Sequence, residues 1–332
     1  MKKTATAKRQ QPTTKLIGTL RSLLRSLFNS SDPSRLPDLP LELVAEILCR
    51  LPVKLLLQLR CLSKSFNNLI SDPNFAKKHL RLSTTSRNLI LTYFDDTIDR
   101  KPTLVFYRLH SIFHRSRSIF NSVTVKPTQL HYLFDPLYSI IVGSCNGILC
   151  LDKNDFEMVE QSDVILWNPS VGKFKILPSF KIQGECGLVK YGFGYDHVKD
   201  VYKIVAVFSY YCCNEVFKTQ GMVHTLGTNS WRTIQWELPL PCSCESLIYV
   251  SGALNWLCKD NRNHSVVFFD LVIESYRRLL LPNYGGEYLD KGITNLAVYD
   301  FKNGTFKKPL IQDFIGSITF EVCIESLISP CF

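Results

Sequence analysis

The sequence predicts an α+β multidomain protein in which a small three-helix module precedes a long all-β, propeller-like region. Apolar residues recur at helical spacing between residues 41 and 70, and past residue 83 the pattern changes to short apolar or alternating runs separated by turn residues. A half-unit consisting of a turn followed by an aromatic residue then recurs four times. Such repetition is typical of four-stranded antiparallel blades arranged around an axis.

Composition places the chain among foldable globular proteins. Of its 332 residues, 45% are hydrophobic and 20% charged, which suffices for a buried core and excludes wholesale disorder. Glycine and proline, at 16 each, are used at ordinary frequency, so collagen-like and low-complexity classes are excluded. No run of 18 apolar residues occurs, and we therefore expect no membrane span.

The positive charge is concentrated near the start of the chain. Residues 1–33 contain seven Lys or Arg against one acid, residues 34–80 contain seven against four, and the remaining residues contain 25 against 24. A nucleic-acid-binding domain would spread basic residues over a folded face. The nearly neutral body argues against that class, so we expect no nucleic-acid partner; the alternative is a basic binder whose affinity resides in the segment 1–33.

Residues 1–33 form a basic tail that we expect to be flexible. Within it, leucines between Leu16 and Phe28 recur at helical spacing with arginines between them, which predicts a short amphipathic helix. Three interpretations remain open. The helix docks on the protein or frays, the basic residues form a nuclear-import patch, or the segment is an organelle transit peptide.

The twelve cysteines indicate a reduced compartment and no metal site. No C-x-x-C pair occurs, and the near neighbours are Cys145 with Cys150, Cys242 with Cys244 and the adjacent Cys212 and Cys213. Most cysteines lie in apolar strand-like runs, where a free thiol behaves as a small hydrophobic side chain. We therefore expect no metal and a location in the cytoplasm, the nucleus or both.

Residues 34–82 contain the strongest helical pattern. The three predicted helices span 41–51, 53–62 and 63–70. In the first helix Leu43, Ile47 and Leu51 recur every four residues, Pro52 ends it, and the third helix ends before Pro73. A unit this small cannot enclose all of its leucines, so part of the apolar surface must face a partner or the rest of the chain.

The run L-P-D-L-P-L-E-L-V-A-E-I-L-C-R-L-P-V-K, continued by S-K-S-F-N-N-L-I-S-D-P, resembles the F-box of plant F-box proteins. The resemblance implies binding to the Skp-type adaptor of a cullin-RING ubiquitin ligase. The positions it implies for that contact are Leu36, Pro37, Leu39, Pro40, Leu43, Ile47, Leu48, Leu51, Pro52 and Phe66. Phe66 stands where the family usually has tryptophan. The alternative is that these leucines are core residues of an ordinary helical hairpin.

The region from residue 83 to 332 carries the repeated half-units. Their four copies are 168–174, 225–231, 270–276 and 300–306. A second half-unit with Gly-x-Leu begins at Gly147 and at Gly252, and a hairpin is predicted from 192–196 and 201–205, closed by 197–200.

These segments also resemble the F-box-associated interaction domain of the same plant family. The motifs that carry the resemblance are S-C-N-G-I-L-C-L, L-W-N-P-S-V-G-K-F, Y-G-F-G-Y-D and E-S-L-I-S-P. The family's second domain is similar to kelch-type propellers, and the resemblance implies that it captures the protein to be ubiquitylated. The substrate itself stays unknown.

The spacing of the repeated aromatic residues predicts that one blade is missing. These residues are Phe174, Trp231, Tyr276 and Phe306, and the last interval between them is much shorter than the two before it. It is too short for a full unit, judged against units of ~40 to 50 residues. We therefore expect an internal deletion of roughly one blade near 284–292. It would leave unpaired edges, a gap in the ring, or a smaller closed ring.

No catalytic constellation emerges, so we expect no enzyme, no catalytic residue and no cofactor. The chain lacks G-x-x-x-x-G-K and G-x-S-x-G motifs, and Gly192-x-Gly194 lacks the third glycine of a dinucleotide loop. His110 and His114 lack the glutamate of a zinc protease. The carboxylates Asp95, Asp96 and Asp99 are typical of a solvated turn.

The function expected is that of a substrate-recognition subunit of an SCF-type ubiquitin ligase, whose contribution is proximity and not covalent chemistry. The alternative is a non-catalytic scaffold, or a shortened decoy that binds the adaptor without delivering a substrate.

Overall fold

A computed structural model gives the fold of the chain. The residues that it describes are 41–82, 87–94, 102–108, 128–129, 140–152, 161–162, 164–181, 186–211, 217–234, 247–260, 263–280, 298–300, 305–307 and 318–331. The basic tail 1–33 and the deletion predicted near 284–292 lie outside them. The chain divides into two compact units, Met1–Thr84 and Thr85–Phe332, which are described separately below.

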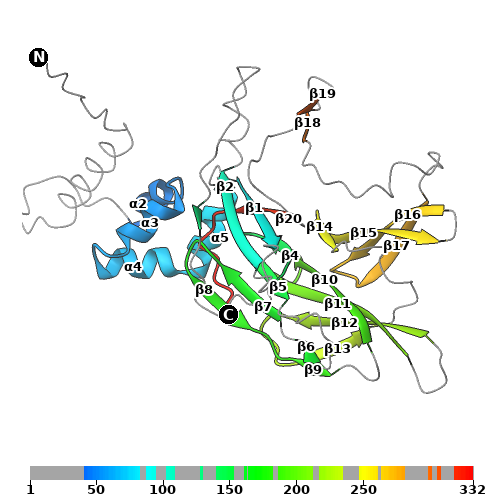
Figure 1. Cartoon of the computed structure of the whole chain (residues 1–332). Helices are drawn as coiled ribbons and strands as arrows, with labels where there is room; N and C mark the ends of the chain where they lie inside the picture. The colour runs from blue at the N-terminus through cyan, green and yellow to red at the C-terminus, as the bar shows by residue number, and fades with distance from the viewer. Residues whose placement is uncertain are drawn as a thin grey trace, which may run out of the picture. The chain divides into compact units, whose positions relative to one another are not determined.

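The first unit is helical. Its described helices are α2 (Leu41–Leu48), α3 (Val53–Leu59), α4 (Lys64–Ser71) and α5 (Pro73–Leu82) (Figure 1). The first three confirm the predicted helices, whereas α5 corrects the expectation of a three-helix module. Pro73 begins α5 instead of only ending α4, because a proline fits a first helical turn where its missing N–H is not needed.

Capping side chains define where the later helices begin. The Ser63 hydroxyl accepts a hydrogen bond from the Phe66 amide at 3.1 Å at the start of α4. The Asp72 carboxylate accepts from the amides of Asn74 at 2.7 Å and Phe75 at 3.0 Å at the start of α5. Each cap satisfies amides that the helix itself leaves without partners.

The second unit is built of antiparallel sheets (Figure 1). Sheet I contains β20 (Ile318–Ile324), β1 (Arg87–Phe94), β2 (Pro102–Arg108) and β3 (Thr128–Gln129) in that order. Sheet II contains β4 (Ile140–Cys145), β5 (Ile148–Asp152), β7 (Val164–Asn168) and β8 (Lys173–Ile176). Sheet III contains β10 (Cys186–Asp196), β11 (Val201–Tyr211), β12 (Phe217–Thr225) and β13 (Trp231–Ile234).

Sheet IV contains β14 (Ile248–Val250), β15 (Ala253–Asp260), β16 (Asn263–Asp270) and β17 (Ser275–Leu280). Two further sheets have two strands each, β6 (Gln161–Ser162) with β9 (Phe180–Lys181), and β18 (Val298–Asp300) with β19 (Thr305–Lys307). The strand β4 lies against β20 and β10, and β10 lies against β14. Sheets I to IV therefore follow one another through their first strands, as in a propeller, which confirms the predicted fold class.

Sheet I joins the two ends of the β unit. Its strand β20 pairs antiparallel with β1, so that Asn88 lies opposite Cys323 and Ile90 opposite Glu321. Ile90 and Cys323 belong to one buried cluster with Trp167 of sheet II. The last described strand is therefore a structural part of the first sheet.

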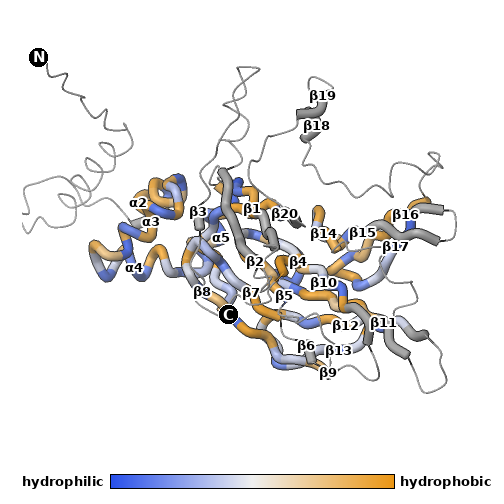
Figure 2. The backbone as a smooth tube through the Cα atoms, viewed as in Figure 1, coloured by the Kyte–Doolittle hydropathy of each residue, from blue (hydrophilic) through white to orange (hydrophobic). Residues whose placement is uncertain are grey.

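Hydrophobic runs identify the strands that are covered on both faces. All five residues of β5 and all five of β7 are buried, and Figure 2 shows the hydrophobic colouring along the central strands. In β11 every residue from Tyr202 to Phe208 is buried. Continuous apolar runs are expected where a sheet is packed on both sides.

Two glycines of β10 bring sheets III and IV together. A Cβ on Gly192 would lie 2.7 Å from the Leu247 Cβ, and one on Gly194 would lie 2.6 Å from a Leu271 methyl carbon. The Leu247 amide donates to the Tyr191 carbonyl at 3.2 Å, which fixes the backbone at this close approach. The motif Gly192-x-Gly194 therefore serves strand packing.

Gly192→Ala is expected to destabilise the β unit by about 1–3 kcal/mol, because the new methyl group would overlap a carbon fixed to a hydrogen-bonded backbone. Urea unfolding followed by tryptophan fluorescence measures the change. Gly143→Ala in β4 is the matched control, since its nearest neighbour, the Phe193 Cβ, lies at an ordinary 3.6 Å. Equal stability of the two variants would contradict the packing role.

Candidate functional site

The helix α2 exposes two large apolar side chains on its outer side. Leu43 and Ile47 are each 51% exposed and lie four residues apart, so they share one helical face. Val44 and Leu48, at 4% and 1% exposure, lie about 100° further around the helix and form its buried side. This half-exposed pair is an apolar surface that nothing in the described helical unit covers.

The structure divides the predicted adaptor-contact residues into surface and core. Leu43, Ile47 and Pro52 are exposed and Leu51 is partly buried, whereas Leu48 and Phe66 are buried. Leu36, Pro37, Leu39 and Pro40 lie outside the described residues. The contact role of all ten stays a prediction, but Leu48 and Phe66 pack within the helical unit, so a charge at Leu48 would disrupt the fold before it reported on docking.

Two contacts that the sequence did not reveal hold α5 in the helical unit. His79, at 1% exposure, lies with its Nε2 atom 2.8 Å from the Leu51 carbonyl oxygen. Lys78 forms an ion pair with Glu46 of α2, and the hydrogen bond from Lys78 holds the pKa of Glu46 below its ordinary value. The partners of these contacts are 28 and 32 residues apart in the sequence. Helical periodicity relates only near neighbours, so it does not predict such contacts.

In the β unit, three of the sequence motifs meet at one place. The Asn168 side-chain amide donates to the Ser326 carbonyl and hydroxyl, both at 3.1 Å, and to the Ile328 carbonyl at 2.7 Å. The Ser326 hydroxyl in turn donates to the Asn146 carbonyl at 2.6 Å. The segment after β20 is therefore tied to two turns of sheet II by buried hydrogen bonds.

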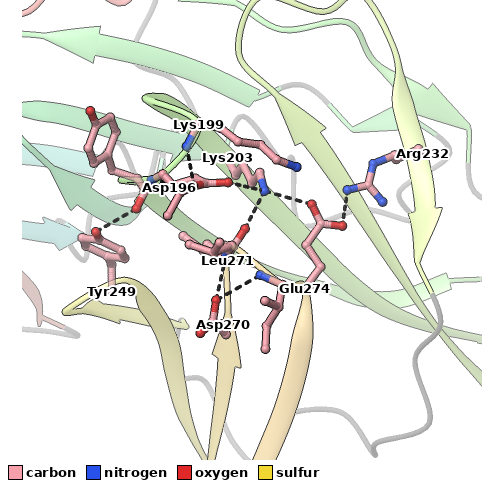
Figure 3. Close-up of polar contacts among 12 residues, drawn as sticks. Asp196, Lys199, Lys203, Arg232, Tyr249, Asp270, Leu271 and Glu274 are labelled. Atoms are coloured by element: carbon pink, nitrogen blue, oxygen red, sulfur yellow. Dashed lines mark hydrogen bonds and ion pairs between the residues drawn. The ribbon is translucent and has the colours of Figure 1, made fainter.

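A buried lysine ties sheet III to sheet IV (Figure 3). The Lys203 ammonium lies 2.8 Å from a carboxylate oxygen of Asp196 and 2.9 Å from one of Glu274, and it donates to the Leu271 carbonyl. Lys203 is 1% exposed and Asp196 is fully buried. Arg232 binds the second oxygen of Glu274. We refer to Lys203, Asp196, Glu274 and Arg232 as the lysine cluster.

Glu274 occupies a position where the equivalent turn of sheet II has glycine. Its φ is 54° and its amide donates to the Asp270 carbonyl at 2.9 Å, whereas Gly172 has a φ of 67° and donates to Asn168 at 3.0 Å. A left-handed conformation is unfavourable for a residue with a side chain. Its ion pair with buried Lys203 offsets that strain.

The charges of the lysine cluster compensate one another. Burial alone would raise the pKa of Asp196 and of Glu274, but hydrogen bonds from Lys203, and from Arg232 to Glu274, hold both pKa values below their ordinary range. Because the ammonium is buried and paired, it is not available to a substrate. The cluster is a structural tie between the sheets.

The remaining polar groups of the described residues form no metal site. Among the residues that the structure describes, no three His, Cys, Asp or Glu side chains lie close enough to hold a metal ion. His110, His114, Asp95, Asp96 and Asp99 lie outside those residues. Of the described free cysteines Cys49, Cys145, Cys150 and Cys323 are buried, and burial raises the pKa of Cys323 to about 12. No helix in the described part of the chain could cross a membrane.

Glu274→Gln is expected to destabilise the β unit by about 2 kcal/mol at pH 7, because Lys203 loses one of two carboxylate partners. The pKa of Glu274 is lowered from 4.5 in the folded state, so its stabilisation is present at neutral pH and is lost as the pH falls through that lowered value. Unfolding measured from pH 7 to pH 3 should show the difference from wild type shrinking toward zero.

Arg232→Gln provides the comparison, since the Arg232 side chain is 52% exposed and exposed pairs contribute about 1 kcal/mol or less. A Glu274→Gln effect that did not depend on pH would contradict the ionic role of the cluster.

Known proteins resemble both units. Residues 36–78 match the F-box domain, and residues 90–314 match the F-box associated beta propeller domain. An F-box/kelch-repeat protein of Arabidopsis thaliana is 29% identical over 255 residues, which cover 74% of this chain and 66% of that protein. An F-box protein of the same plant is 26% identical over 275 residues, covering 78% and 63%.

The chain spans between 51% and 68% of the length of the first three curated relatives that it matches. Among solved structures, a protein from Lactobacillus plantarum aligns over 64% of this chain and 70% of its own with 8% identity and a TM-score of 0.30, a likeness too weak to support an argument. The propeller-domain match alone takes in well over half of the 332 residues, and it begins at residue 90, after the F-box match ends at residue 78. The chain therefore belongs to the family of F-box proteins that carry an F-box associated beta propeller domain.

Proposed function

We propose that this protein is the substrate-recognition subunit of an SCF-type ubiquitin ligase. The helical unit binds the Skp-type adaptor through the surface of α2, and the β unit binds the protein to be ubiquitylated. The observation that carries the proposal is the pair Leu43 and Ile47, half exposed on a helix that lies inside the F-box match. A soluble helix gains by burying such a pair against a partner.

The contribution of the protein to catalysis is proximity. Holding a target beside the activated ubiquitin of the ligase raises the effective concentration of its lysines, and this requires no catalytic group in the receptor. The proposal places the protein in the cytoplasm, the nucleus or both, where a cullin-RING ligase acts.

A second candidate is a decoy or scaffold that binds the adaptor without delivering a target. The observation that favours it is the interval of 30 residues from Tyr276 to Phe306, which is shorter than the intervals between the earlier repeated aromatic residues. A β unit that lacks one blade would offer a smaller surface to a target.

Leu43→Glu combined with Ile47→Glu is expected to weaken binding to a purified Skp-type adaptor roughly 100-fold, because two apolar contacts are replaced by charges. Isothermal titration measures the affinity, and circular dichroism checks that the helices remain folded. Leu82→Glu is the control, since Leu82 is also apolar and 46% exposed but lies at the end of α5. Unchanged adaptor affinity in the double variant would refute the docking surface.

The receptor and the decoy differ in one outcome. The double variant is first used to capture target proteins, because it should not pass them on to the ligase. The captured proteins are then tested as targets in a reconstituted reaction that contains adaptor, cullin, RING subunit and wild-type protein. Ubiquitin on a captured target that depends on the wild-type protein supports the receptor. Adaptor binding at full strength without any modified target supports the decoy.

A further inference from the structure

The contact between sheets II and III includes one row of side chains that crosses all four strands of sheet III. Phe193 of β10 lies opposite Ile204 of β11, which lies opposite His224 of β12. His224 in turn lies opposite Trp231 of β13. Phe193, Ile204 and His224 are each 0% exposed. A histidine is therefore buried in the middle of a row that is otherwise apolar or aromatic.

Both ends of this row meet sheet II. A Cβ added to Gly143 of β4 would lie 3.6 Å from the Phe193 Cβ. The indole N–H of Trp231 donates at 2.6 Å to the carbonyl of Pro178, two residues after the end of β8. His224 lies between these two ends on the same face of sheet III, because residues directly opposite one another in a sheet share a face. His224 therefore faces sheet II.

One ring nitrogen of His224 is hydrogen-bonded and the other is buried without a partner. The Nδ1 atom lies 3.2 Å from the Ser230 carbonyl oxygen. A carbonyl only accepts, so Nδ1 carries the proton of the neutral ring and Nε2 has a lone pair. Among the residues that the structure describes, none forms a hydrogen bond with Nε2. The ring also packs on Trp231, with ring centroids 5.2 Å apart.

The charged groups around His224 disfavour a second proton on its ring. Lys175 of β8 acts on the ring with its positive charge, and Lys173 lies on the same face of that strand. The lysine cluster belongs to the other face of sheet III, because Lys203 and Arg232 each directly adjoin a residue of the row. In the described part of the chain, no carboxylate forms an ion pair with His224.

The two contacts of sheet III thus respond differently to acid. Towards sheet IV, the buried charge of Lys203 is compensated by Asp196 and Glu274, whose pKa values are held below their ordinary range. Towards sheet II, burial is the main cause that holds the pKa of His224 below its ordinary 6.5, and the charge of Lys175 adds to it, although a hydrogen bond to a backbone carbonyl opposes the shift.

We propose that His224 makes the contact between sheets II and III sensitive to mild acid, so that this contact opens while the contact between sheets III and IV holds. A proton on Nε2 would create a buried N–H that no described residue accepts and a buried positive charge without a carboxylate. The carboxylates of the lysine cluster stay ionised over the same range, because their pKa values are lowered.

The direction of the effect follows from where the proton binds. The opened contact exposes His224 to water and lets it bind a proton near its ordinary pKa of 6.5, whereas the closed contact binds it only at a lower pH. The ratio of closed to open protein therefore falls as the pH drops below 6.5. The fall is at most roughly tenfold for each pH unit, and it stops once the pH reaches the lowered pKa of the closed form.

Hydrogen exchange of the tryptophan indole N–H groups, followed by NMR in the full-length protein from pH 7 to pH 5.5, tests the proposal. Trp231 reports on the contact between sheets II and III through its bond to the Pro178 carbonyl. Trp256, 4% exposed in the cluster that joins sheets III and IV, is the internal reference. We expect the protection of Trp231 to fall by up to roughly tenfold relative to that of Trp256. An equal loss at both residues, or none at either, would overturn the proposal.

His224→Phe keeps an aromatic ring beside Trp231 but cannot bind a proton. In this variant the ratio of the two protections should no longer depend on pH, whatever its stability at pH 7. His197→Gln is the matched control, since His197 is exposed in the turn between β10 and β11, and it should keep the wild-type response. An acid response that survives in His224→Phe would assign the effect to another group. Adaptor binding enters none of these measurements, so the inference is tested independently of the proposed function.

Discussion

A buried polar side chain must find its hydrogen-bonding partners inside the protein, and this requirement governs how the β unit is assembled. The buried ammonium of Lys203 on sheet III is paired with Asp196 and Glu274, and Glu274 belongs to the turn that leads into β17 of sheet IV. The side-chain N–H groups of Asn168 likewise donate to the segment after β20. Leaving a buried charge unpaired costs about 3–5 kcal/mol and a buried neutral amide about 1–3 kcal/mol. Neighbouring sheets are therefore fixed in one relative position where apolar packing alone would tolerate several.

Sequence pattern predicted the features that depend on near neighbours in the chain. The turns at Asn168 and Asp270, the hairpin between β10 and β11 and the first three described helices all follow from residues within one or two turns of each other. The pairing of β1 with β20 was not predictable, because no local signal connects strands that lie at opposite ends of the β unit's sequence. The helix α5 was missed because a proline after a helix usually ends it, although Asp72 before Pro73 is a capping residue.

The F-box motif indicated ten contact positions but did not show which of these residues are exposed and which are buried. Leu43 and Leu48 have the same side chain and lie in the same helix, yet the first is half exposed and the second is buried. Periodicity gives the angle between two residues around a helix and leaves open which side faces the other helices. That choice depends on how α3, α4 and α5 pack, and their packing rests on contacts such as His79 with Leu51. Substitutions chosen from the motif alone would have mixed folding with binding.

The place of β20 in sheet I has a consequence for how the protein is made. Its partner β1 leaves the ribosome long before β20 is synthesised, and until residues 318–324 follow, an edge of β1 remains unpaired. During that interval the open edge of β1 is a site at which other chains can pair, because unpaired strand edges in incompletely folded proteins are prone to aggregation. A chain truncated before Ile318 would lack β20, and the edge of β1 would stay unpaired. That exposed strand edge would distinguish the truncated product from the finished protein.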